Sequence, residues 1–152
     1  KQLSLKIVVN KDNGFKSAAA QSIKEMLEKL KISVTVSALS EKDYRSAVAS
    51  GKYDMYIGEV KLTENMSLSP LLKNGGSVAY GINTSGAAST AYSAFLAGSS
   101  DVNTFIDAFN ADMPFVPLCY RSGLAIYTRT LKYGNANHIN DVYADIDSWD
   151  FH

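Results

Sequence analysis

Hydrophobic and polar residues alternate at the start of the chain and then change to a helical spacing. Residues 3–9 alternate Leu, Leu, Ile and Val with mostly polar residues, which predicts a strand with at least one face toward a core. A turn is expected over residues 10–14. Beyond it, apolar residues recur at helical spacing, which predicts an amphipathic helix. They are Ala19, Ile23, Met26, Leu27 and Leu30.

Two further strands and a second helix are expected after this helix. Residues 32–36 alternate β-branched residues with Ser and Thr, and residues 53–58 form a third, largely apolar segment. Between them, Ser40 and Asp43 have the spacing of a capping box, and Gly51 marks the end of the helix. The order strand, helix, strand, helix, strand predicts an α/β fold with an open, mostly parallel sheet flanked by helices.

The pattern becomes less regular in the second half of the chain. We expect a helical turn near residues 70–72, a short helix around residues 92–96, and a longer helix that begins at Ser100 or Asp101. The apolar residues 115–120 predict a late strand at an edge or hinge, because the prolines in and before this segment remove backbone donors.

Composition and charge describe an ordinary folded domain. The chain has 152 residues, which suits one domain, and its 15 basic residues balance 15 acidic ones. The basic residues are scattered, so no nucleic-acid partner is expected. No apolar run approaches the roughly eighteen residues of a membrane-spanning helix. The first residues lack a signal-peptide core and an initiator methionine, so we expect a processed or excised segment.

No catalytic or metal-binding set emerges from the sequence. Acyl transfer needs a nucleophile, a base and a group that orients the base. The two histidines do not favour this role, because His138 stands in a polar turn and His152 ends the chain. Cys119 lies in an apolar run and is expected to be a buried, inert thiol. We therefore expect no catalytic residues, no cofactor and no bound metal.

Polar residues at the ends of the first and third predicted strands are the candidates for ligand binding. In open parallel sheets, ligands bind beyond the carboxyl ends of the strands, where the strand order reverses. Glu59 and Lys61 follow the third strand, Tyr56 lies near its end, and Asn10 ends the first strand. The alternative is that these residues belong to solvated loops, and the sequence leaves both interpretations open.

Several segments occur in an order and spacing that cover nearly the whole chain. They are Val8-Val9-Asn10, Lys31-Ile32-Ser33-Val34, Tyr44, Gly51-Lys52-Tyr53-Asp54-Met55-Tyr56-Ile57-Gly58, Met113-Pro114-Phe115-Val116-Pro117-Leu118, and Asn140-Asp141-Val142 with Trp149. In order and spacing they resemble the C-terminal part of the peptide/nickel-type (family 5) extracellular solute-binding proteins of ABC transporters.

The resemblance implies a two-lobed receptor that closes on a solute and delivers it to an ABC permease. Residues 1–122 would form part of a periplasmic-binding-protein-like lobe, and residues 123–152 would return across the hinge to the other lobe. The implied solute is an oligopeptide or a similar small molecule. The implied location is extracellular or periplasmic, at the cell surface, with membrane attachment only through an anchor outside this chain. The alternative is a ligand-sensing regulatory module of the same fold without transport.

One departure from the family bears on the ligand. Peptide-binding members often have a tryptophan directly after the third-strand glycine and an acidic residue shortly afterwards that holds the amino terminus of the peptide. Here Glu59 follows Gly58, and Leu62 stands near the acidic position. The resemblance therefore implies binding of a free amine only if Glu59 supplies the negative charge from a shifted place.

Overall fold

The computed structural model describes residues 3–121, 129–132 and 146–151. Its contacts group into two compact units. The first consists of Lys1–Lys61 with Leu68–Pro114, and the second of Leu62–Ser67 with Phe115–His152. The domain boundary expected between residues 122 and 123 lies outside the described residues, so it stays a prediction.

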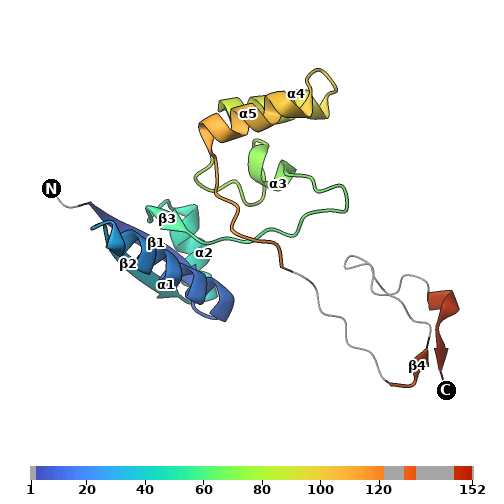
Figure 1. The fold of residues 1–152 in the computed structure, drawn as a ribbon, viewed down its shortest axis with the longest axis horizontal. Helices are drawn as coiled ribbons and strands as arrows, with labels where there is room; N and C mark the ends of the chain where they lie inside the picture. Colours follow the sequence, from blue (N-terminus) through green and yellow to red (C-terminus); the bar gives the residue numbers. More distant parts are fainter. Residues whose placement is uncertain (1–2, 122–128, 133–145, 152) are drawn as a thin grey trace. The chain divides into compact units, whose positions relative to one another are not determined.

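A three-stranded parallel sheet forms in the first unit (Figure 1). Strand β1 (Ser4–Asn10) pairs residue by residue with β2 (Ser33–Leu39) along its whole length. On its other side, β1 pairs with the short strand β3 (Met55–Tyr56). The strand order is therefore β2-β1-β3, with β1 in the centre. This confirms the predicted α/β class with a parallel sheet and flanking helices.

Strand β3 is shorter than the strand expected over residues 53–58. Backbone hydrogen bonds extend the pairing slightly, because Asp54 N donates to Lys6 O over 3.1 Å and Ile57 N donates to Val8 O over 3.2 Å. The Asp54 carboxylate also accepts a hydrogen bond of 2.7 Å from Lys6 N. A side chain thus occupies the donor that a longer β3 would use, which explains where the strand begins.

Helices α1 (Gly14–Lys29) and α2 (Glu41–Ala49) cover the two faces of the sheet. Side chains alternate between faces along a strand, so Val8 points away from the side to which its neighbours Ile7 and Val9 point. Ile7 and Val9 pack with Ala20 of α1 in the main core cluster. Val8 is equally buried on the other face, where α2 packs on β1 and β2. Right-handed crossovers to opposite sides of β1 give this arrangement.

The apolar face of α1 differs in part from the expected one. Met26 and Leu30 are exposed, although both follow the helical spacing. The positions that turn toward the sheet are 16, 20, 23 and 27, because α1 packs on β1 and β2 with Ala20 fully buried in the core cluster. This register buries a charged residue, Lys16, in the first turn.

The predicted helix boundaries of α2 are confirmed. The Ser40 hydroxyl accepts a hydrogen bond of 3.3 Å from Asp43 N, which is the N-cap contact expected from their spacing. Gly51 has φ +67°, a left-handed conformation that glycine adopts without steric cost, and it follows the C-cap residue Ser50. Helix α1 is capped similarly, since the Asn13 side chain accepts from Lys16 N over 3.1 Å.

Three further helices complete the first unit near their predicted places, but the second begins at Ala87, before the residues 92–96 expected for it. They are α3 (Ser69–Leu72), α4 (Ala87–Leu96) and α5 (Val102–Asp112). Asp101 is the N-cap of α5, because its side chain accepts a hydrogen bond of 2.8 Å from Thr104 N. Helices α4 and α5 pack together through the rings of Tyr92 and Phe105, whose centroids lie 5.3 Å apart.

The second unit corrects two predictions. Residues 115–120 form no strand within the described part of the chain, which agrees with the absence of N–H donors at Pro114 and Pro117. Cys119 is exposed and not buried, because no strand carries it into a core. The described elements here are β4 (Leu131–Lys132), the 3₁₀ helix η1 (Ile146–Ser148) and β5 (Asp150–Phe151), which pairs antiparallel with β4. His138 and His152 lie outside the described residues.

Candidate functional site

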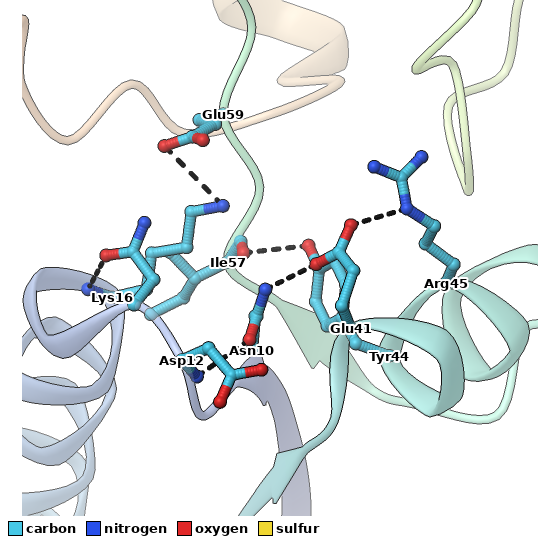
Figure 2. Close-up of polar contacts among 9 residues, drawn as sticks. Asn10, Asp12, Lys16, Glu41, Tyr44, Arg45, Ile57 and Glu59 are labelled. Carbon is cyan, nitrogen blue, oxygen red and sulfur yellow. Dashed lines mark hydrogen bonds and ion pairs between the residues drawn. The ribbon is translucent and has the colours of Figure 1, made fainter.

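The candidate site lies at the carboxyl ends of β1 and β3 (Figure 2). The chain leaves β1 toward β2, while β3 lies on the opposite side of β1, so the strand order reverses between these two ends. In open parallel sheets this reversal separates the connecting loops and leaves the strand ends accessible to ligands. Asn10 ends β1, and Ile57 to Glu59 follow β3, so the structure brings these predicted residues to one edge.

Lys16 is a buried cation at this edge. Only 7% of the residue is exposed, and its side chain extends from the first turn of α1 toward the end of β3. The Nζ atom lies 3.5 Å from Glu59 Oε2 and 5.9 Å from the centroid of the Tyr44 ring. A buried lysine needs an opposite charge nearby, and Glu59 provides it. The Glu59 side chain is itself 57% exposed.

Tyr44 connects α2 to the same edge. Its hydroxyl donates a hydrogen bond of 2.9 Å to the carbonyl oxygen of Ile57, directly before Gly58. Burial raises the pKa of Tyr44 to about 12, with smaller contributions from Tyr56, Glu41 and Glu59, against which Arg45 acts. Tyr44 is therefore a neutral hydrogen-bond donor at neutral pH.

Asn10 joins the end of β1 to the start of α2. Its Oδ1 atom accepts a hydrogen bond of 2.8 Å from Asp12 N, and its amide nitrogen donates to Glu41. Glu41 also forms an ion pair with Arg45 one turn later in α2. A carboxylate in the first turn of a helix is stabilised by the helix dipole, so Glu41 is well placed here. Asn10 therefore links the end of β1 to the first turn of α2.

Charges of both signs meet at this edge, and with the exposed carboxylate of Asp12 the anions drawn in Figure 2 outnumber the cations. The cations Lys16 and Arg45 face the anions Glu41 and Glu59, and Asn10 and Tyr44 add neutral hydrogen-bonding groups. Such a set offers both signs of charge to a ligand within a small area. Across the described ranges, no three His, Cys, Asp or Glu side chains gather where a metal ion could sit.

Tyr56 and Lys61 take different places from the other predicted residues. The Tyr56 hydroxyl donates a hydrogen bond of 3.1 Å to Tyr80 O, and its ring packs at a steep angle on Tyr53, with centroids 4.9 Å apart. Burial raises the pKa of Tyr56, with further contributions from Tyr53 and Tyr80. Lys61 is exposed, and within the described residues no hydrogen bond or ion pair joins it to the cluster.

The sequence pattern missed Lys16, Glu41 and Arg45 as members of this edge, and it assigned Tyr44 only to a buried helix face. A signal for Lys16 is present, because it stands four and seven residues before Ala20 and Ile23 and so shares their apolar face. A lysine in that stripe needs a partner at the sheet edge. The partner itself, Glu59, is more than forty residues away, and only the pairing of β1 with β3 brings it close.

Comparison with known proteins identifies no family and no relative. No protein-family model matches the chain, and no curated protein matches it. Among the described residues, no helix combines the length and the apolar character needed to cross a bilayer. Function must therefore be inferred from the fold and from the chemistry of the edge formed by β1 and β3.

Proposed function

We propose that the chain is the ligand-binding lobe of a solute-binding protein of an ABC importer, and that it binds a peptide or a similar small solute at the carboxyl edge of β1 and β3. The protein delivers this solute to a membrane permease from an extracellular or periplasmic position at the cell surface. The observation that carries the proposal is the ion pair between buried Lys16 and exposed Glu59 at the reversal of strand order.

Three features of this edge support ligand binding over a purely structural role. A buried charge costs several kcal/mol of desolvation, on the order estimated for ions in proteins, so a structural edge gains little from Lys16. The carboxylate of Glu59 reaches solvent, where a ligand can meet it. The surrounding hydrogen bonds of Tyr44 and Asn10 fix the backbone on both sides, which pre-organises the edge.

The proposed mechanism is closure of two lobes around the solute. The edge described here forms one wall, and a second lobe supplies the other. Closure then depends on contacts that the ligand makes with both walls, so the ligand favours the closed state by its differential affinity for it. No bond is made or broken in this mechanism, and the charged side chains act by electrostatic complementarity.

A thermal-shift screen on the full natural polypeptide that carries these residues tests the proposal. The probes are a tripeptide mixture, the free amino acids, a nickel–histidine chelate and maltose. A ligand that binds only the folded state raises the melting temperature, so one class should raise it. The Glu59→Ala variant should lose this shift. Glu28→Ala removes an exposed carboxylate on α1, away from the ends of β1 and β3, and should retain the shift.

Two results would contradict the proposal. One is the absence of a shift with every probe, and the other is a shift that Glu59→Ala retains in full. Uptake of the bound solute by cells that lack the protein then separates transport from sensing. Impaired uptake supports the importer, while normal uptake with intact binding indicates the regulatory module.

A further inference from the structure

Lys16 is 7% exposed as a residue, and its ammonium group makes one long contact with an anion. An ammonium has three N–H donors. In the described part of the chain, the Lys16 ammonium has one ion pair, at 3.5 Å from Glu59 Oε2, and the Tyr44 ring at 5.9 Å. Charge-assisted hydrogen bonds are about 2.7–2.9 Å long, so this ion pair is a loose one. Lys16 therefore has the capacity to bind a further anionic group.

We propose that Lys16 binds the carboxylate of a free amino acid whose ammonium group binds Glu59. This inference rests on the proposed function and names its class of solute. In this proposal Lys16 is a ligand-binding residue, and the 3.5 Å pair of Lys16 with Glu59 is the contact that the ligand replaces. On binding, each charge of the pair exchanges its partner for the opposite charge of the ligand.

The spacing of the two protein charges selects the ligand. Because Nζ and Oε2 are only 3.5 Å apart, the ammonium and carboxylate of the ligand must also lie close together. In an α-amino acid both groups are bonded to the same carbon. In a peptide the two termini are separated by at least one further residue, so they cannot occupy both positions together without a larger displacement of the edge.

The charges of the two ion pairs also favour an amino-acid zwitterion as the ligand. Lys16 pairs with Glu59 and Arg45 pairs with Glu41, so neither ion pair carries a net charge. A zwitterion adds no net charge, whereas a simple anion would approach Glu59 without compensation and a simple cation would approach Lys16 in the same way. Like charges placed together at an interface cost binding energy, so the edge disfavours both.

The two members of the pair also differ in how they can move. The Lys16 side chain is 9% exposed, while that of Glu59 is 57% exposed. Because the Glu59 side chain is the more exposed of the two, we expect Glu59 rather than Lys16 to change its rotamer when a ligand binds. Lys16 also lies in the first turn of α1, where the helix dipole favours a bound carboxylate.

Calorimetric titration of the full natural polypeptide tests the inference. The probes are the twenty common amino acids and a tripeptide mixture. We expect at least one amino acid to bind. Its C-terminal amide and its N-acetyl derivative should each bind about tenfold more weakly or worse, because each lacks one charge-assisted contact.

Two variants assign the contacts to residues. Lys16→Met keeps the length of the buried side chain and removes its charge, so it should abolish the preference for the acid over the amide. Glu59→Gln should abolish the preference for the free amine over the N-acetyl derivative. It should leave the preference for the acid over the amide intact. Lys24→Met, which removes a charge from the same helix away from this edge, should change neither preference.

The outcomes separate this inference from the proposed function. Binding of tripeptides without any amino acid keeps the importer proposal and overturns the assignment of an amino-acid ligand. Binding of nothing overturns both. An unchanged preference for the acid over the amide in folded Lys16→Met overturns the role of Lys16. If that variant does not fold, the acid and amide titrations of the unmodified protein still decide whether a carboxylate is recognised.

Discussion

The Tyr44 hydroxyl lies 2.9 Å from the carbonyl oxygen of Ile57 and donates a hydrogen bond to it. This contact joins helix α2 to the chain that leaves β3, two residues before Glu59. Lys16 reaches Glu59 from α1, on the other face of the sheet. The two helices therefore both hold the segment that presents Glu59, and the candidate site depends on the packing of both.

Replacing Tyr44 by phenylalanine should destabilise the protein. The variant leaves the Ile57 carbonyl without its side-chain donor, and we expect a loss of about 1–2 kcal/mol of unfolding free energy. Urea unfolding measures it, with Tyr120→Phe as a control because Tyr120 is exposed. The control should change stability by less than about 0.5 kcal/mol. Equal stability of the two variants would show that the Tyr44 bond contributes nothing.

Stability should fall at alkaline pH because of the same residue. The pKa of Tyr44 is about 12 in the folded protein, compared with an ordinary value of 10.0. Below pH 10 both states carry the proton, so the full stability is present. Between pH 10 and 12 the unfolded state loses the proton first, and stability decreases. Unfolding curves across this range should show the slope, and Tyr44→Phe should reduce it. A slope unchanged in that variant would contradict the assignment to Tyr44.

Acidification should weaken the N-terminus of α5. The backbone amide of Thr104 donates to the Asp101 carboxylate, and this bond, with one from the Thr104 side chain, holds the pKa of Asp101 below its usual value of 3.8. The stabilisation is present above pH 3.8 and is lost as the pH falls through the lower folded-state pKa. Amide exchange in the first turn of α5 should increase over that range. Asp101→Asn retains a capping side chain and should remove the pH dependence.

A pair of glycine substitutions should separate backbone strain from a side-chain clash. Gly81 and Gly75 have nearly equal φ angles, +72° and +73°, so alanine costs about 1–2 kcal/mol of strain at either position. A Cβ at Gly81 would also lie 2.5 Å from the Tyr53 hydroxyl oxygen, whereas a Cβ at Gly75 meets nothing within 4 Å. Gly81→Ala should therefore be more destabilising in thermal unfolding.

The Tyr53 contact can be tested by rescue. Combining Gly81→Ala with Tyr53→Phe removes the hydroxyl that a Cβ would meet, so the double variant should regain part of the stability that Gly81→Ala loses. Tyr53→Phe alone is the control. If the double variant loses the sum of both single effects, the contact between residue 81 and Tyr53 is absent in solution.

The sequence by itself determined most helices and strands of the first unit, although β3 is shorter and α4 begins earlier than predicted. Strands β1 and β2 and helix α2 follow from local signals, because alternation, helical spacing and the Ser40–Asp43 cap act within a few residues of each other. The parallel pairing follows as well, since a helix between two strands requires a crossover. The late strand over 115–120 was wrong, because an apolar segment forms a strand only when a partner edge accepts it.

The tertiary structure alone decided which polar residues meet. Position at a strand end predicted Asn10 and Glu59 for one edge, but it also predicted Lys61, which no described hydrogen bond or ion pair joins to the cluster. Lys16 and Glu59 are far apart in the chain, and their 3.5 Å contact exists because β3 pairs with β1 in a register in which Ile57 N donates to Val8 O. Local sequence fixes helices and strands through short-range hydrogen bonds, whereas the site depends on packing between segments that no local pattern encodes.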